Sequence, residues 1–439
     1  MMLVGYLLLF AIVGFFFIDE LQKNNWSLFS IFIVYCLIQY AIVPISFLSL
    51  DNPSSIMPKS FHIENLYPVV DWYVFIVTVV FFAFFILSYK LSLAPKVDQV
   101  YTRLSPVITY AQPFAILLLC VSAFSLFYYM NAFGGFDGMV KASQMVRSGH
   151  ADKLDLNNSL MTKRLIGLSF SSLALSAFIE SKITKKIIFS FSLIIIIIYA
   201  FFISASKESI IELFLILYIF YCIKNKRSYL LIGFVLLVFF IASLVILDSI
   251  VNYISSGEFI FSNEGLIDIL RLFSFSQTSL GIAIHADYSS LYFSDIITNL
   301  NSTIVPSATI PSLIESYSLI TDFSTQRLNT SFYWGTYDAI VPPSVIAFGY
   351  YNLGVFGVVI VAICFGWGLA FFDRNFSLLI NYDIRTALPY ALFCLQAISL
   401  ARVTIPKYTV YFTPNLVLIV IFLAIFVTSS KSTFYRIKW

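Results

Sequence analysis

Residues 187–223, IIFSFSLIIIIIYAFFISASKESIIELFLILYIFYCI, decide the fold class of this chain. Two apolar runs, Ile187–Ile203 and Ser209–Ile223, flank a short polar turn that contains Lys207. A helix of roughly 20 predominantly apolar residues crosses the hydrocarbon core of a bilayer. Each run therefore predicts a transmembrane helix, and the turn predicts a hairpin with Lys207 at a membrane surface.

The same pattern recurs along the whole chain. Of the 439 residues, 60% are hydrophobic and only 11% are charged, whereas about a quarter of the residues in soluble proteins are charged. Too few polar residues remain to cover a soluble surface, so we predict an all-α polytopic membrane protein with about eleven transmembrane helices. The runs are Leu3–Ile18, Leu28–Leu48, Val69–Leu87, Phe114–Met130, Leu165–Ile179, Ile187–Ile203, Ser209–Ile223, Leu230–Leu247, Ala347–Phe372, Ala387–Leu400 and Thr413–Val427.

The distribution of Lys and Arg predicts the orientation, because short cytoplasmic loops carry an excess of these residues. The loop after the third run contains Lys90, Lys96 and Arg103. When this loop is placed in the cytoplasm, the inner loops receive most of the basic residues of the chain, and most acidic residues fall outside. The N-terminus is then outside and the C-terminus inside.

This orientation divides the chain into three regions. Residues 1–247 form eight transmembrane helices, with an outer loop at 131–164. Residues 248–345 form a large outer loop, and residues 346–439 form three further helices and a cytoplasmic tail. A loop of this length is uncommon and usually functional.

The large outer loop contains its own helical pattern. Within residues 263–275, NEGLIDILRLFSF, apolar residues repeat at helical spacing around Arg271. The pattern predicts a short helix, which either lies along the membrane interface or dips back into the protein.

Cationic side chains gather on the predicted outer side. Charged groups near membrane depth are costly unless they are paired or functional, and Arg and Lys both bind phosphate oxygens. These cations therefore predict a site for a lipid-linked diphosphate, with surface ion pairs or contacts to lipid headgroups as the alternative. They are Lys207, Arg271, Arg327, Arg147, Arg164 and Arg402.

Two further features of the large loop suit a sugar substrate. Tyr333 and Trp334 follow Arg327, and aromatic rings stack on the C–H faces of sugars; the alternative is an interfacial aromatic belt. His285 stands two residues before Asp287, and a histidine beside a carboxylate can act as a general base. The alternative is a structural histidine. The sequence contains neither a soluble nucleotide-binding motif nor cysteines at metal-ligand spacing.

The stretch 341–358, VPPSVIAFGYYNLGVFGV, joins the large loop to the next span. Its two prolines predict the end of the loop, because a helix rarely continues through the residue before proline. Gly349, Gly354 and Gly357 predict that a loop or a neighbouring helix approaches this span closely. We interpret the stretch as the wall at which a lipid-linked sugar enters, with plain helix packing as the alternative.

Two of these stretches resemble the O-antigen polymerases, the Wzy-type oligosaccharide repeat unit polymerases. FFISASKESIIELFLILYIF, residues 201–220, resembles the family's span–turn–span, with Lys207 where Arg is commoner. The segments YFSDIITNLNSTIVPSATIP and VPPSVIAFGYYNLGVFGVVIVAICFGWG resemble its proline-bearing loop and its span entry marked by glycine and aromatic residues. The plan of about eleven spans with one dominant outer loop is also similar.

The resemblance implies a GT-C-like glycosyltransferase of lipopolysaccharide biosynthesis, in the bacterial inner membrane with its site facing the periplasm. Such an enzyme transfers the growing glycan from undecaprenyl diphosphate to an incoming lipid-linked repeat unit, without a metal ion or other cofactor. Its partners would be the lipid-linked oligosaccharide, the bilayer, a chain-length regulator and a flippase, and no nucleic acid. We expect His285, Asp287 and Arg271 to be catalytic, and Lys207, Arg327, Arg402, Arg164, Tyr333 and Trp334 to bind substrate.

Two other functions stay open. An O-antigen ligase shares the same plan and differs in its acceptor. A lipid-linked oligosaccharide flippase, which is a transporter, belongs to a different class. The single large outer loop and the lack of an internal repeat favour an enzyme over a flippase.

Overall fold

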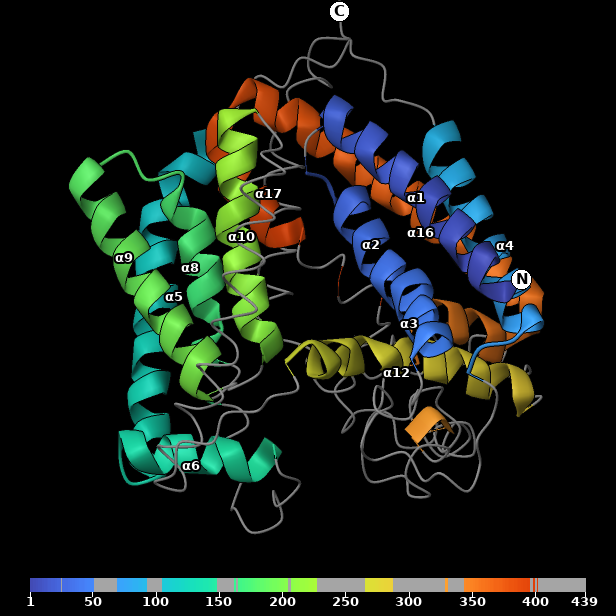
Figure 1. Cartoon of the computed structure of the whole chain (residues 1–439). Coiled ribbons are helices and arrows are strands. Elements are labelled where there is room, and N and C mark those ends of the chain that lie inside the picture. Colours follow the sequence, from blue (N-terminus) through green and yellow to red (C-terminus); the bar gives the residue numbers. More distant parts are fainter. Residues whose placement is uncertain are drawn as a thin grey trace, which may run out of the picture. The chain divides into compact units, whose positions relative to one another are not determined.

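A computed structural model describes residues 1–24, 26–50, 69–92, 105–147, 162, 165–203, 207–226, 265–286, 328–330, 343–394, 398 and 401. Every regular element in these ranges is a helix (Figure 1). Within the described residues, six helices are long and apolar enough to cross a membrane, which agrees with the predicted all-α membrane protein. They are Met2–Gln22, Leu28–Ser49, Trp72–Leu91, Tyr110–Ala132, Lys182–Ile203 and Val345–Asn381. The predicted spans 230–247 and 413–427 lie outside the described residues.

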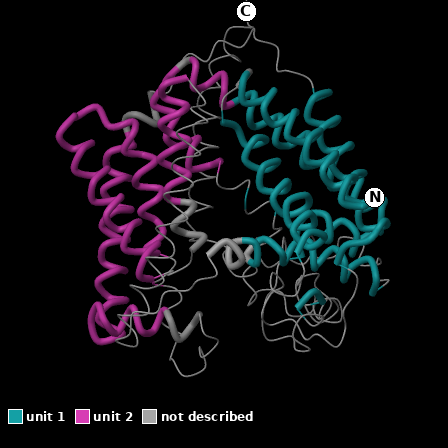
Figure 2. The backbone as a smooth tube through the Cα atoms, viewed as in Figure 1, with its two compact units in different colours: residues 1–94, 266–375, 396–410 teal, residues 95–265, 376–395, 411–439 magenta. Residues whose placement is uncertain are grey.

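The chain folds into two compact units (Figure 2). Unit 1 contains Met1–Ala94, Leu266–Asn375 and Gln396–Val410. Unit 2 contains Pro95–Gly265, Phe376–Leu395 and Tyr411–Trp439. Each unit therefore combines segments from two or more of the regions expected from the sequence, because a helical bundle joins helices that are distant along the chain.

Unit 1 begins with α1 (Met2–Asn24) and a second span built from α2 (Leu28–Leu37), η1 (Ile38–Ile42) and α3 (Val43–Ser49). The middle part of this span, η1, is a π-helix. Pro44 follows it, and a proline has no N–H and clashes with the carbonyl four residues earlier, here that of Tyr40. The proline accounts for the wider turn at this point.

The large loop supplies unit 1 with α12 (Gly265–His285). This helix runs crosswise to the long helices of the unit (Figure 1). At its beginning, Leu270 and Phe273 pack against Val43, Phe47 and Val69. From Ser276 to Ile284 every residue is buried. Of the two arrangements that the sequence allowed, the helix therefore adopts the one in which it packs within the protein.

The last long helix is α16 (Val345–Tyr382), which belongs to unit 1 as far as Asn375. It lies beside α4 (Trp72–Leu91), where Ser88 Oγ donates to the carbonyl of Ile363 at 2.8 Å. It is broken at Leu353 and Gly354, where Gly354 has φ 57° and ψ −142°. This is a region that only glycine enters readily. Gly349 and Gly357 then meet across the break, so close that a Cβ on either would clash with backbone atoms of the other side. A close approach is present at Gly349 and Gly357, but the partner is the first part of the same helix and not the predicted loop or neighbouring helix.

Unit 2 contains α5 (Ser105–Ala132), α6 (Phe136–Arg147), α8 (Leu168–Ser176), α9 (Lys182–Ile198), η5 (Tyr199–Ile203), α10 (Lys207–Asn225), η6 (Ile384–Thr386) and α17 (Ala387–Cys394). Serine side chains join α5, α8 and α9. Ser172 Oγ donates to the Ala115 carbonyl at 2.8 Å, and Ser192 Oγ donates to Ser172 Oγ at 3.0 Å. Small polar residues of this kind allow membrane helices to approach closely.

Three elements of unit 2 differ from the sequence expectation. In the predicted outer loop 131–164, Gly134 and Gly135 have positive φ and form a turn, and the next residues form α6. The predicted span 165–179 contains the nine-residue α8, in which every residue except Phe170 is buried. The predicted span 387–400 contains the eight residues of α17 in its described part. Both short helices are apolar because they are enclosed by protein.

Candidate functional site

Polar side chains from distant segments of unit 1 surround α12. We call this set the α12 belt. All of its members are buried, and none carries a charge, so each needs a hydrogen-bond partner inside the protein. The members are Tyr40, Ser276, Gln277, Ser279, Asn329, Ser344 and Tyr351.

Two chains of hydrogen bonds join the belt. The Tyr40 hydroxyl donates to Ser344 Oγ at 2.5 Å, and Ser344 Oγ lies 3.4 Å from the carbonyl of Ser276. The Tyr351 hydroxyl donates to Asn329 Oδ1 at 3.2 Å, and Asn329 Nδ2 donates to Ser279 Oγ at 3.0 Å. The belt thus holds α12 against the π-helix, the broken helix and a piece of the large loop.

Unusual backbone geometry concentrates at the belt. Tyr40 lies in the π-helix η1, and Ser344 has φ 71°, in the left-handed region that L-residues other than glycine rarely adopt. Tyr351 lies two residues before the break of α16 at Leu353. Such conformations cost about 1–3 kcal/mol each and cluster at functional sites. This convergence identifies the belt and its helix as the candidate site.

Ionisable side chains lie in the first half of α12 and at its C-terminal end. At its C-terminal end, His285 Nε2 lies 2.6 Å from Asp71 Oδ2, and both side chains are about one-quarter exposed. The other oxygen, Asp71 Oδ1, accepts a hydrogen bond from the N–H of Val74 at 2.7 Å and caps α4. Nearer the N-terminal end, Arg271 is partly exposed, and its carbonyl accepts from Ser274 Oγ.

The structure describes three of the nine predicted site residues. Arg271 and His285 share α12, and Lys207 is the first residue of α10 in unit 2. Outside the described residues lie Asp287, Arg164, Arg327, Arg402, Tyr333 and Trp334. Asn329, two residues after Arg327, ties this part of the large loop to α12.

Sequence reasoning missed Asp71 as the partner of His285. Its position directly before an apolar run is typical of a helix cap, which it is, but nothing in the local pattern connects it with a residue more than two hundred positions later. Sequence reasoning also missed the belt, because Ser, Asn, Gln and Tyr scattered in apolar segments give no periodic signal.

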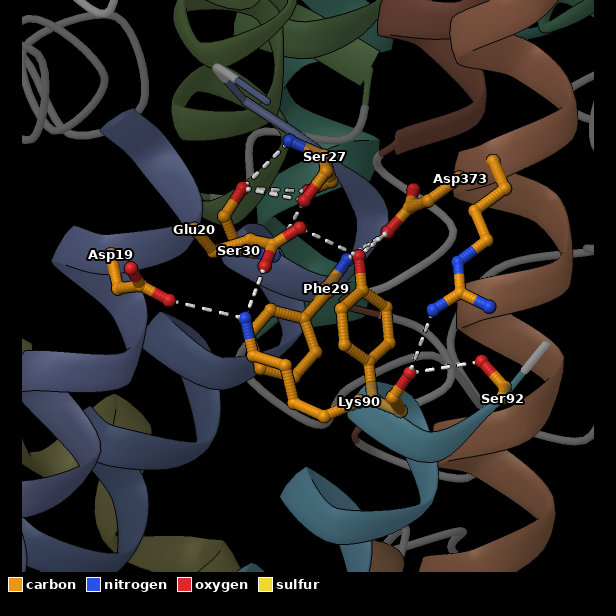
Figure 3. A network of polar contacts seen from close by, with 10 residues as sticks. Asp19, Glu20, Ser27, Phe29, Ser30, Lys90, Ser92 and Asp373 are labelled. Atoms are coloured by element: carbon orange, nitrogen blue, oxygen red, sulfur yellow. Dashed lines mark hydrogen bonds and ion pairs between the residues drawn. The ribbon is translucent and has the colours of Figure 1, made fainter. Parts of the chain in front are cut away.

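A second polar centre, the ionic network, lies at the other end of α4 from Asp71 (Figure 3). Lys90 Nζ lies 2.7 Å from Glu20 Oε2 and 3.3 Å from Asp19 Oδ2. The Tyr89 hydroxyl lies 3.0 Å from both Glu20 Oε1 and Asp373 Oδ2. Asp373 is only 6% exposed and Glu20 only 2%, so both charges depend on these partners.

The ionic network joins four helices, α1, α2, α4 and α16. The carboxylate of Asp373 in α16 accepts hydrogen bonds from the N–H groups of Leu28 at 2.8 Å and Phe29 at 3.0 Å. These are two of the N–H groups that the first turn of α2 leaves without a partner in the helix. Ser27 caps the same turn through its hydroxyl. Because its groups engage one another, we assign the network to holding the bundle together.

Among the described residues, no group of His, Cys, Asp and Glu side chains is arranged to hold a metal ion. Comparisons of the chain with protein-family models, with curated proteins and with solved structures find no match.

Proposed function

We propose that the chain is a membrane glycosyltransferase that polymerises lipid-linked oligosaccharide repeat units on the outer side of the bacterial inner membrane. The observation that carries the proposal is α12. It is a helix of the large loop, it is held by buried polar contacts, and it carries Arg271 in its first half and, as its last residue, His285, which pairs with Asp71. The orientation predicted from the basic loops would place Asp71, at the start of α4, on the outer side of the membrane.

In the proposed reaction, the anomeric carbon of the growing glycan leaves undecaprenyl diphosphate and bonds to a hydroxyl oxygen of the incoming repeat unit. Arg271 offsets the charge that develops on the departing diphosphate. His285 accepts the proton of the attacking hydroxyl, while Asp71 holds the imidazole in one tautomer and stabilises it when charged. The α12 belt does not touch substrate; it fixes the helix that carries these groups.

The glycans of cells that lack the gene test the proposal against its rivals. A polymerase defect leaves a single repeat unit on the lipid A core. A ligase defect leaves an unsubstituted core, with polymer still on the carrier lipid. A flippase defect leaves an unsubstituted core and repeat units on the inner side of the membrane. Either of the last two results would overturn the proposal.

The Arg271→Ala variant is expected to lose activity. Purified protein with a synthetic lipid-linked repeat unit should form polymer at least about tenfold more slowly, because one charge contact to the leaving diphosphate is missing. Arg271→Lys should recover part of the rate, since the charge returns without the planar fork. Arg436→Ala, in the predicted cytoplasmic tail, is the control and should leave the rate unchanged. An unchanged rate for Arg271→Ala would remove this residue from the mechanism.

The effects of Asp71→Asn and His285→Ala should not add. Asparagine caps helices as well as aspartate, so Asp71→Asn keeps the cap of α4 and removes only the charge beside His285. We expect it to slow polymerisation about tenfold in the wild type and to have almost no effect in His285→Ala. Initial rates of the four proteins measure this coupling. Independent effects would show that Asp71 does not act through His285.

A further inference from the structure

The first turns of α9 in unit 2 break a rule of helix electrostatics. A helix N-terminus carries a partial positive charge, so acidic residues are favoured there and basic residues are disfavoured. The first turn of α9 contains no acidic residue. Instead, Lys182, Lys185 and Lys186 follow the capping residue Ser181. The helix dipole and three lysines therefore add up to a strongly positive region.

Cations from two other elements reach the same region. Lys185 is partly buried, and its Nζ donates to the carbonyl of Ala177 at 3.0 Å. Arg385 and Asp383 beside η6 and Lys224 at the end of α10 are all close enough to act on its charge. Cations that gather in one region indicate a place where an anion would be stabilised.

The neighbouring carboxylates only partly neutralise these charges. Asp383 is engaged by Arg385, whose Nη2 lies 2.7 Å from Asp383 Oδ2 and whose Nε lies 2.9 Å from the same oxygen. This hydrogen bonding raises the pKa of Arg385, so the guanidinium stays charged. Glu180 is the other carboxylate that acts on Arg385, and it is exposed to solvent. The three lysines of α9 with Lys224 and Arg385 carry five positive charges, against the two negative charges of Asp383 and Glu180.

An exposed apolar strip begins beside the lysines. Ile183, Ile187, Phe191 and Ile194 are all exposed, Ile183 by 74%. Their spacing places them on one face of α9, whereas Ile188, Ser192 and Ile195 turn toward the interior of the unit. Lys182 and Lys186 each precede a residue of the strip. Their ammonium groups therefore lie beside the N-terminal end of an apolar surface that can contact an acyl chain.

We propose that the start of α9 is a binding site for an anionic phospholipid. Lys182 and Lys186 contact the phosphate of the headgroup, with Lys185, Lys224 and Arg385 supplying the surrounding positive potential. One acyl chain lies along the strip from Ile183 to Ile194. A free phosphate ion would satisfy the cations but leave the strip without a partner, which is why we assign a lipid. None of these residues belongs to the α12 belt or to the ends of α12, so the proposal is independent of the proposed enzyme activity.

Lipid binding to the full chain in neutral detergent tests the site. We expect dioleoyl phosphatidylglycerol to bind, counted by native mass spectrometry, and to raise the midpoint of thermal unfolding. Dioleoyl phosphatidylcholine and inorganic phosphate at the same concentration should not do so. The double variant Lys182→Gln/Lys186→Gln should bind phosphatidylglycerol about tenfold more weakly. Both lysines are exposed, so the variant should fold.

Two matched variants separate the charge from the strip. Lys141→Gln, an exposed lysine of α6, should bind phosphatidylglycerol like the wild type. Ile187→Ser should weaken phosphatidylglycerol binding while all lysines remain. Three results would overturn the proposal: equal binding of both phospholipids, wild-type affinity in the double lysine variant, or stabilisation by inorganic phosphate equal to that by the lipid, which would indicate a simple anion site.

Discussion

Replacing Asp373 by alanine is expected to lower the free energy of unfolding by about 3–5 kcal/mol, the range measured when one partner of a buried ionic cluster is removed. The Asp373 carboxylate satisfies the N–H groups of Leu28 and Phe29 and also contacts the Tyr89 hydroxyl. Alanine would leave two buried N–H groups at the start of α2 without a partner, and each such group carries its own desolvation cost. Thermal unfolding of the purified protein in detergent measures the loss.

Two other substitutions in the ionic network calibrate this result. Asp373→Asn keeps the shape of the side chain but offers one carbonyl oxygen to two N–H groups, so its loss should be intermediate. Asp19→Ala should cost much less, because Asp19 is about a quarter exposed and its contact with Lys90 is 3.3 Å long. If Asp373→Ala and Asp19→Ala lowered the unfolding midpoint equally, the capping contacts would contribute nothing beyond ordinary surface pairing.

The sequence allows the helices of this protein to be predicted much better than their contacts. Apolar length locates α1 and α4 to within a few residues, because a bilayer fixes the number of residues that a span requires. The contact of Asp373 with the start of α2 depends on two segments separated by 344 residues. The sequence around Asp373 does not indicate that its carboxylate contacts the start of α2. The sequence around Phe29 likewise does not indicate that a distant carboxylate contacts this helix terminus.

In the candidate site too, the helix is predicted from the sequence better than its contacts are. The helical spacing of apolar residues around Arg271 predicts α12. A helix that packs on one side keeps its apolar residues on that side, which gives this repeat. The continuation of α12 to His285 was not predicted, since Ser276, Gln277 and Ser279 interrupt the apolar pattern. Tertiary partners allow them to be buried: Gln277 Nε2 donates to the carbonyl of Val69, and Ser279 Oγ accepts from Asn329 Nδ2. Ser344 Oγ lies against the backbone carbonyl of Ser276. Polar residues such as these are usually expected at a surface. In this protein the tertiary structure buries them.

For Gly349, Gly354 and Gly357, the sequence predicts that glycine is required but does not predict for which purpose. Glycine in an apolar segment indicates either close approach or an unusual conformation. Here Gly354 supplies the conformation, with φ 57°, and Gly349 and Gly357 supply the close approach. The sequence does not distinguish these roles, because all three glycines lie within one apolar run.

The second large effect is expected from Gly357→Ala. A Cβ at this position would lie 2.0 Å from the carbonyl oxygen of Gly349 and 3.2 Å from Leu353 Cβ. The carbonyl oxygen belongs to the backbone and cannot rotate away, so the two parts of α16 must separate. Overpacking of this kind costs about 3 kcal/mol, and here it also moves Ser344 and Tyr351, which hold α12 through the belt. We therefore expect both the unfolding midpoint and the polymerisation rate to fall.

Gly368→Ala in the same helix is the matched control for this prediction. No heavy atom lies within 4 Å of the Cβ that it would add, and alanine in a helix is more stable than glycine by roughly 0.5–1 kcal/mol. The two substitutions make the same chemical change in one helix, yet their effects on the unfolding midpoint should have opposite signs. If Gly357→Ala were as stable as Gly368→Ala, the break in α16 would not be held by the Gly349–Gly357 contact. The position of α12 would then have to depend on the belt's hydrogen bonds alone.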